Sequence, residues 1–184
     1  MKRKLVVGWG VIVVATIAVT LVLAQFYGAP WTLPSDASLE RDFRSHRVQF
    51  DSLVTLALSI PGLELAHPGI AQVGGRVIHR AASGTGMTPE RWNELQRLMF
   101  ELKIAGVWPA AGSVVLDRAV HTTVIKGYRW TSAQPTDPTR SATRTHASPA
   151  QTLVPKLDGA SPGAYGELHR AIGDGWYLIL RRND

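Results

Sequence analysis

The sequence contains no cysteine. This absence excludes disulfide bonds, a thiol nucleophile and a lipid-modified cysteine. Motifs that carry chemistry are also missing, including the His-Glu-x-x-His zinc motif, a complete phosphate-binding loop and the Gly-x-Ser-x-Gly nucleophile elbow. The sequence therefore predicts neither a metal nor a cofactor, and a fold of about 150 residues must be stable through packing alone.

Strong clustering of charge is missing as well. The net charge is +6, but Lys2, Arg3 and Lys4 supply half of it, and 17 basic residues face 14 acidic ones in the rest of the chain. Modules that bind nucleic acids gather basic residues on one face, whereas the arginines of this sequence are scattered. We therefore expect no nucleic-acid partner.

The most prominent feature present is an uncharged, proline-free apolar run from Leu5 to Ala24. About 20 residues at 1.5 Å per residue cover about 30 Å, the thickness of the hydrocarbon core of a bilayer. The sequence thus predicts a cytoplasmic tail at 1–4, a single-pass transmembrane signal-anchor at 5–26 in contact with the lipid bilayer, and a stalk at 27–35. Basic residues precede the run, so the positive-inside rule places the protein in the inner membrane with a periplasmic C-terminal domain. A cleaved signal peptide is the alternative.

Small residues recur within this apolar run. Gly8, Thr16, Thr20 and Ala24 follow a four-residue spacing that Ile12 interrupts. Small side chains at this spacing let two transmembrane helices approach closely. The four residues are therefore candidates for helix packing, although a segment built of small and branched residues produces such a pattern by chance.

Residues 36–184 are predicted to form a single α+β domain. Apolar residues at steps of three and four predict an amphipathic helix from about Asp36 to Ile60. The run Thr88-Pro89-Glu90 supplies an N-cap, a first-turn proline and a first-turn acid, and it predicts the start of a second helix. Between the helices, proline and glycine indicate a loop from Leu63 to Gly75, followed by a short strand from Arg76 to Ala82.

The period changes to strand-like alternation after the second helix. Asp117-Arg118 is interpreted as a turn between two strands, and Gly173-Asp174-Gly175 as the turn of a C-terminal hairpin. The predicted strands are Ser113–Leu116, Val120–Lys126 with a continuation to Trp130, Tyr165–Ile172 and Trp176–Arg181. A Ser/Thr/Pro-rich stretch at 131–150 is predicted to be a flexible loop. The expected architecture is two amphipathic helices packed on a small antiparallel sheet.

Candidates for chemistry are few. His79, His121 and His169 all lie on predicted strands, with Asp117 and Glu167 as acidic partners. If their strands were neighbours, the three histidines would meet on one face of the sheet. Separate surface or half-buried histidines are the commoner arrangement. These five residues are therefore weak catalytic candidates for a cell-envelope hydrolase tethered to the membrane.

Four short motifs carry a family resemblance. They are Phe43 with His46-Arg47 and Phe50-x-x-Leu53, then Arg91-Trp92-x-x-Leu95, Lys126-Gly127-Tyr128 and Gly175-Trp176-Tyr177-Leu178. In their order and spacing they resemble a group of small bacterial membrane-anchored proteins with a single outer α+β domain. The resemblance implies that fold for the chain after the stalk, and it implies no activity and no catalytic residues.

The absence of a convergent polar constellation favours a binding or accessory module without catalysis, displayed outside the membrane and engaging a protein partner there. The membrane-tethered hydrolase is one alternative. A structural or immunity-type partner protein is another, but an immunity protein typically carries a strongly charged patch complementary to its target. The nearly balanced charge of residues 36–184 makes that alternative less favoured.

Overall fold

The structure is a computed structural model of the chain, and it describes residues 33–81, 84–121, 124–132, 150–162 and 166–182. The chain divides into two compact units, Met1–Thr32 and Leu33–Asp184. The first unit lies outside the described residues, so the architecture below is that of the second unit.

Three helices are described: α2 (Asp36–Ser45), α3 (Arg47–Ser59) and α4 (Pro89–Glu101). The start of α4 is confirmed, because the Thr88 side chain accepts a hydrogen bond from the Arg91 N–H and Pro89 occupies the first turn. The long helix predicted from Asp36 to Ile60 is two helices. His46 leaves helical geometry at φ −124° and ψ 26°, and its N–H donates to the carbonyls of Asp42 and Phe43. No proline or glycine marks this break, so the sequence carried no signal for it.

Nine strands form one sheet in the described part of the chain. They are β1 (Leu63–His67), β2 (Ile70–Val73), β3 (Arg76–Ile78), β4 (Gly106–Ala110), β5 (Ser113–His121), β6 (Val124–Thr131), β7 (Ala150–Leu153), β8 (Gly166–Gly173) and β9 (Trp176–Arg182). The strand order is β3-β2-β1-β4-β5-β6-β9-β8-β7. The neighbouring strands are antiparallel except β7 and β8, which run parallel.

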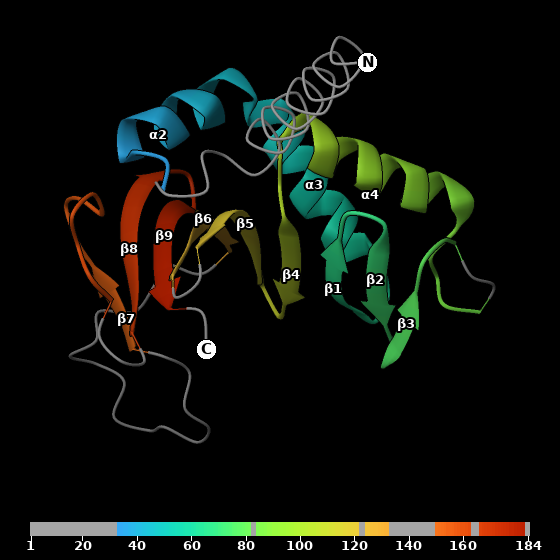
Figure 1. The fold of residues 1–184 in the computed structure, drawn as a ribbon. Coiled ribbons are helices and arrows are strands. Elements are labelled where there is room, and N and C mark those ends of the chain that lie inside the picture. Colours follow the sequence, from blue (N-terminus) through green and yellow to red (C-terminus); the bar gives the residue numbers. More distant parts are fainter. Residues whose placement is uncertain (1–32, 82–83, 122–123, 133–149, 163–165, 183–184) are drawn as a thin grey trace, which may run out of the picture. The chain divides into compact units, whose positions relative to one another are not determined.

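The helices lie along one face of this sheet (Figure 1), and the main core fills the space between the two layers. Apolar residues of α2, α3 and α4 pack there against inward-facing residues of the central strands, among them Leu116, Tyr128 and Leu178. The opposite face, away from the described helices, is called the far face below. It carries a second and smaller apolar cluster of Val115, Tyr177 and Ile179, with Trp108 packed against it.

Four aromatic rings join the helices to the sheet. Phe43 of α2 and Phe50 of α3 contact Tyr128 of β6 and Trp176 of β9, with ring centroids 4.6–6.2 Å apart. The Tyr128 hydroxyl donates to the Leu39 carbonyl at 3.1 Å, which ties the ring to α2. Three of the four motifs behind the family resemblance therefore meet at one packing junction, and their spacing has a structural explanation.

A buried ion-pair triad makes a second connection between α2 and the sheet. Lys126 of β6 lies 2.7 Å from Asp36 at the start of α2 and 2.7 Å from Asp158. The Asp36 carboxylate also accepts from the Leu157 N–H at 2.7 Å. Charges removed from water in this way are stable only while each keeps its partners. Lys126 thus holds the chain around Asp158 and the first turn of α2 to the edge of the core.

The predicted architecture of two helices on a small antiparallel sheet is wrong in helix number, sheet size and strand direction. Residues predicted as a loop, Leu63–Gly75, contain β1 and β2, which pair antiparallel with a shift of register between Leu63 and Leu65. Beyond the strand ends, the Gly74 N–H donates to the Gly62 carbonyl. Asp117-Arg118 is not a turn but lies inside β5, where the register shifts between Asp117 and Ala119. The C-terminal hairpin of β8 and β9 is confirmed, with Asp174 at φ 49° in its turn.

The membrane prediction also needs correction. The described helices have 10, 13 and 13 residues, whereas a span requires about 20. None of them is long and apolar enough to cross a bilayer. The interpretation as a single-pass, signal-anchored protein of the inner membrane is thus not supported by the described helices. The segment on which it was based, residues 5–26 with Gly8, Thr16, Thr20 and Ala24, lies outside the described residues.

Only the two ends of the loop predicted at 131–150 can be compared with the structure. Residues 133–149 lie outside the described part of the chain. At its two ends the prediction is wrong, because Thr131 closes β6 and Ala150 opens β7. The parallel pairing of β7 with β8 had no counterpart in the sequence pattern.

Candidate functional site

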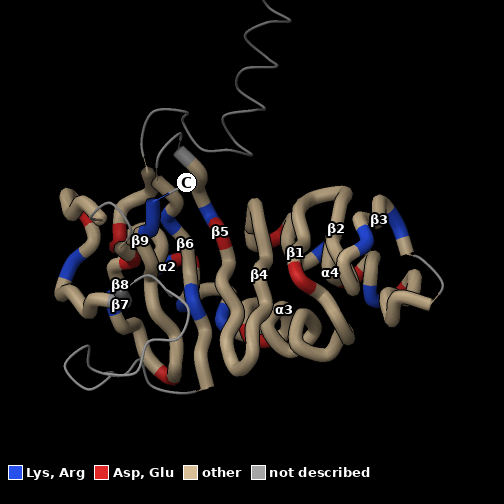
Figure 2. The backbone as a smooth tube through the Cα atoms, turned by 90° about the horizontal axis from the view of Figure 1, so that it is seen from below, with Lys and Arg blue, Asp and Glu red and all other residues tan. Residues whose placement is uncertain are grey.

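Charged residues of both signs occur on the neighbouring strands β5, β6, β9 and β8 (Figure 2). Five titratable residues of these strands lie on the far face, and Trp108 of β4 lies beside them. We call this group the far-face cluster: Trp108, Asp117, Arg129, Glu167, His169 and Arg181. Asp117 is 2% exposed, Glu167 3% and His169 0%. Charged groups are rarely so deeply buried unless they are paired. The cluster is therefore the most concentrated polar feature of the described interior.

Asp117 is held at one end of this cluster. Its carboxylate accepts from the Trp108 indole N–H at 2.6 Å and from Arg181 Nη2 at 3.0 and 3.1 Å. The Arg181 guanidinium also lies 5.5 Å above the Trp108 ring, a cation–π geometry. Burial raises the pKa of Asp117 above its usual range, although Arg181 and Trp108 act in the opposite direction. Removal from water therefore outweighs the two partners.

Close approach of two strands positions this carboxylate. Gly127 of β6 is the register partner of Asp117. A Cβ added at Gly127 would lie 2.1 Å from the Leu116 carbonyl oxygen. Only glycine therefore lets β5 and β6 come together at the bulge that follows Asp117. This gives a local reason for the glycine between Lys126 and Tyr128.

Glu167 is held at the other end. Arg129 Nη2 lies 3.4 Å from one carboxylate oxygen, and His169 Nε2 lies 3.3 Å from the other. Burial acts to raise the pKa of Glu167, but the His169 ring and Arg129 together outweigh it and hold that pKa below its usual range. For Arg129, burial lowers the pKa and Glu167 opposes the change. Both ring nitrogens of His169 lack a hydrogen bond of good geometry.

The structure brings three of the five weak catalytic candidates onto one face. Asp117, Glu167 and His169 belong to the far-face cluster, with the two arginines between them. His79 is exposed just beyond β3, and six strands lie between β3 and β8 in the sheet order. His121 lies at the end of β5, and its side chain is outside the described part of the structure. No set of three metal-ligating side chains converges within the residues described.

A solvent-open hollow lies beside the turn of the C-terminal hairpin, and we call it the hairpin hollow. Its volume is about 400 Å³, and it is lined by Trp130, Thr131, Ser132, Ala171, Gly173, Asp174, Gly175, Trp176 and Tyr177. Tyr177 links it to the far-face cluster, because its ring lies 5.9 Å from that of His169. Hollows with aromatic walls and a few polar groups are typical binding sites.

The rim of the hairpin hollow is held by backbone contacts. The Thr131 N–H donates to the Gly175 carbonyl and the Ser132 N–H to the Gly112 carbonyl, each at 2.9 Å. A Cβ added at Gly175 would lie 2.5 Å from the Thr131 carbonyl oxygen, so the turn closes tightly over the end of β6. The strand ends and the turn at the rim of the hollow are therefore joined by main-chain contacts.

Two polar contacts join the C-terminal hairpin to α3, one from Arg47 to Asp174 and one from Trp176 to Asp51. Arg47 lies 2.9 Å from Asp51 and 3.3 Å from Asp174, and its guanidinium lies 5.0 Å above the Phe43 ring. The Trp176 indole N–H donates to Asp51 at 3.0 Å. The break between α2 and α3 therefore places Arg47 where it can reach the hairpin turn.

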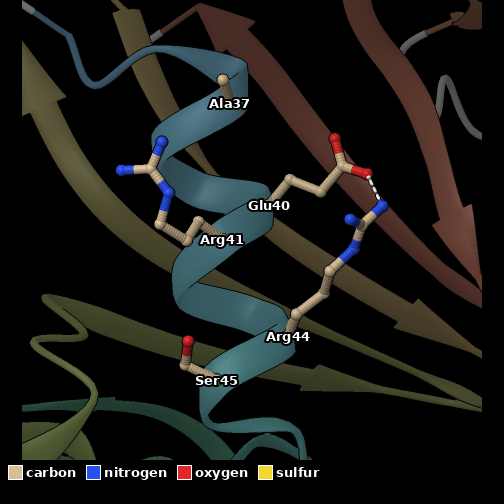
Figure 3. Close-up of a pocket in the computed structure, with 5 residues that line it drawn as sticks. All are labelled: Ala37, Glu40, Arg41, Arg44 and Ser45. Atoms are coloured by element: carbon tan, nitrogen blue, oxygen red, sulfur yellow. Dashed lines mark hydrogen bonds and ion pairs between the residues drawn. The ribbon is translucent and has the colours of Figure 1, made fainter.

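A second hollow, of about 560 Å³, opens on the outer side of α2 (Figure 3) and is lined by Ala37, Glu40, Arg41, Arg44 and Ser45. Glu40 pairs with Arg44 on the same helix and with Arg170 of β8. Arg41 points away from this pair (Figure 3). The Arg44 side chain of the first pair is largely exposed, and such pairs contribute little to stability. None of the described residues that line this hollow is aromatic. It is a weaker candidate than the hairpin hollow.

Sequence reasoning identified members of the far-face cluster but not the hairpin hollow. The structure places Trp130 and Trp176 opposite each other in the β6–β9 register. That pairing depends on strand order, which alternation alone does not fix. The Gly-Asp-Gly turn was the one local signal for this site.

No protein-family model, no curated protein and no solved structure matches the chain. The resemblance to small membrane-anchored bacterial proteins therefore stays a prediction.

Proposed function

We propose that residues 33–184 form a binding module without catalysis, which docks a protein partner at the hairpin hollow. The observation that carries the proposal is an open hollow of about 400 Å³ with Trp130 and Tyr177 in its wall and a polar rim. Aromatic side chains in such positions supply most of the binding energy of protein interfaces, and the surrounding polar groups fix orientation.

The position of the titratable groups also favours binding over catalysis. A general acid or base must lie within hydrogen-bonding reach of a substrate atom. Asp117, Glu167 and His169 are almost fully buried, and two arginines engage the carboxylates. A substrate would have to displace part of the far face to reach them. Their arrangement is that of an internal polar support beneath the face that carries Tyr177.

Site-specific photo-crosslinking tests the proposal. A photoreactive phenylalanine analogue is placed at Ala171, an exposed residue that lines the hairpin hollow, in the full-length protein in its native cells. The matched control carries the same analogue at Val77, which is 60% exposed on the edge strand β3. We expect a discrete crosslinked protein from position 171 and none from position 77. Equal capture at both positions, or none at either, would contradict a docking site at the hollow.

A hydrolase is the second candidate, because Glu167 and His169 are in contact at 3.3 Å. This pair has the composition of a general-base dyad. A panel of ester, glycoside and peptide substrates decides between the two candidates. Hydrolysis that is lost in Glu167→Gln and kept in Glu101→Gln, an exposed acid on α4, would favour the enzyme. Absence of hydrolysis by the wild-type protein would remove this candidate.

A further inference from the structure

The hairpin hollow has an uneven charge. Its described lining contains one carboxylate, that of Asp174, and no lysine, arginine or histidine. The side chain of Asp174 is 82% exposed. The partly exposed Trp130 ring beside an unburied carboxylate is suited to a cation, because the ring face and the carboxylate both attract positive charge.

Asp174 keeps capacity for a second cationic partner. Arg47 approaches only one of its oxygens, Oδ2, at 3.3 Å. The other oxygen, Oδ1, has no hydrogen bond within the described part of the chain. Arg47 is itself shared with Asp51, which it contacts more closely at 2.9 Å. The carboxylate is therefore only partly neutralised by its own chain.

The nearest basic residue on the far face does not compensate this charge. Arg129 is the register partner of Tyr177, and it is engaged by the buried Glu167 at 3.4 Å. On the aromatic side, the Trp130 indole N–H makes no hydrogen bond within the described residues. The hollow thus offers the Asp174 Oδ1 acceptor, the Trp130 indole donor and the partly exposed Trp130 ring for an apolar stem.

We propose that the partner inserts an arginine or lysine side chain into the hairpin hollow. The charged head lies against Asp174, and the methylene stem lies against the partly exposed ring of Trp130. This inference rests on the proposed function, since it names the anchoring group of a partner that docks at this hollow.

Titration with single blocked amino acids tests the anchor directly. The probes are N-acetyl-arginine amide and N-acetyl-citrulline amide, which has nearly the same shape but no charge. The indole N–H signal of Trp130, assigned through Trp130→Phe, reports binding to the full-length ¹⁵N-labelled protein by NMR. We expect the arginine probe to shift this signal with millimolar affinity and the citrulline probe to bind at least about fivefold more weakly.

The matched variant is Asp174→Asn. Asparagine tolerates the left-handed turn geometry of residue 174, φ 49°, so the turn is kept while the charge is removed. We expect Asp174→Asn to weaken arginine binding about fivefold and Glu101→Gln to leave it unchanged. Equal binding of citrulline and arginine, or an unchanged affinity in Asp174→Asn, would overturn the basic anchor.

The outcomes separate this inference from the function on which it rests. If crosslinking from position 171 persists and the arginine probe does not shift Trp130, the docking site stands and the basic anchor fails. If the arginine probe binds and position 171 captures no protein, the hollow is a cation site and the docking proposal fails.

Discussion

The far-face cluster and the hairpin hollow share the strands β8 and β9 but differ in how completely their polar groups are paired within the protein. The cluster buries two carboxylates and gives each an arginine, so its groups are committed to one another. The hollow is lined by the carboxylate of Asp174, whose side chain is 82% exposed, and by the partly exposed Trp130. Polar groups that are fully paired within the protein have little hydrogen-bonding capacity left for a ligand. Groups that are exposed and only partly paired keep that capacity. The comparison favours the hollow as the place of recognition and the cluster as its support.

Breaking the cluster is expected to have the largest effect on stability. Arg181→Met leaves the Asp117 carboxylate buried without its cation, and we expect the free energy of unfolding to fall by about 3 kcal/mol. Urea denaturation at pH 7 measures this loss. The control is Arg182→Met, because the neighbouring arginine is exposed and makes no ion pair in the described structure; its cost is expected to stay below about 0.5 kcal/mol. A similar loss of unfolding free energy in the two variants would contradict the view that the buried charges of the cluster depend on one another.

Straining the turn at the rim of the hollow is expected to have the next largest effect on stability. Gly175 and Gly159 share the same φ of +76°, but an added Cβ meets the Thr131 carbonyl oxygen at 2.5 Å in the first case and nothing within 4 Å in the second. Both alanine variants incur the left-handed penalty of about 1 kcal/mol. Gly175→Ala is expected to cost about 1 kcal/mol more, because the turn must move away from β6. Thermal unfolding of the two variants gives the difference, and equal costs would show that the rim yields easily.

The two carboxylates of the cluster are expected to have opposite pH signatures. Burial raises the folded-state pKa of Asp117 above its usual 3.8, so its contribution to stability falls as pH rises through the range above that value. The folded-state pKa of Glu167 lies below its usual 4.5, so its contribution is present above 4.5 and is lost as pH falls below it.

Unfolding free energies measured from about pH 3 to pH 7 test these signs. Relative to wild type, Asp117→Asn should become more favourable as pH rises above the usual value of 3.8, because it removes a carboxylate that is costly to ionise. Glu167→Gln should become less favourable as pH rises towards 4.5. The same slope for both variants would mean that the two sites do not differ in how they compensate burial.

The smallest effect on stability is expected at the rim of the hollow. Asp174→Asn removes an exposed pair with Arg47, and such pairs typically contribute no more than about 0.5 kcal/mol. The variant should therefore unfold at nearly the wild-type urea concentration while it loses affinity for the arginine probe. A large loss of stability would indicate that the Arg47–Asp174 contact serves the fold and not recognition.

Local signals in the sequence predicted individual elements well. The N-cap, first-turn proline and apolar stripe of α4, and the Gly-Asp-Gly turn of the C-terminal hairpin, depend on a few adjacent residues. The break at His46 was missed because no residue there disfavours a helix. The β1–β2 hairpin was missed because its glycines were interpreted as a loop, whereas they supply positive-φ turn positions such as Gly69 and Gly74.

The candidate site shows the same division. Asp117, Glu167 and His169 were singled out as residue types capable of chemistry, but their roles depend on Arg129 and Arg181, which no local pattern connects to them. Asp117 was assigned to a turn, because Asp-Arg between apolar runs is typical of one. The structure instead buries it in β5, where Trp108 and Arg181 compensate the carboxylate.

By itself the sequence determined the start of α4, the absence of thiol chemistry and the turn that rims the hairpin hollow, because these follow from composition and from residues close together in the chain. Only the tertiary structure decided the strand order β5-β6-β9-β8, and with it which charges became partners. The physical reason is that pairing between strands depends on the summed packing of both sheet faces, and alternation along one strand is compatible with several neighbours. The exposed carboxylate of Asp174 and the buried one of Asp117 differ in their neighbours, not in their chemistry.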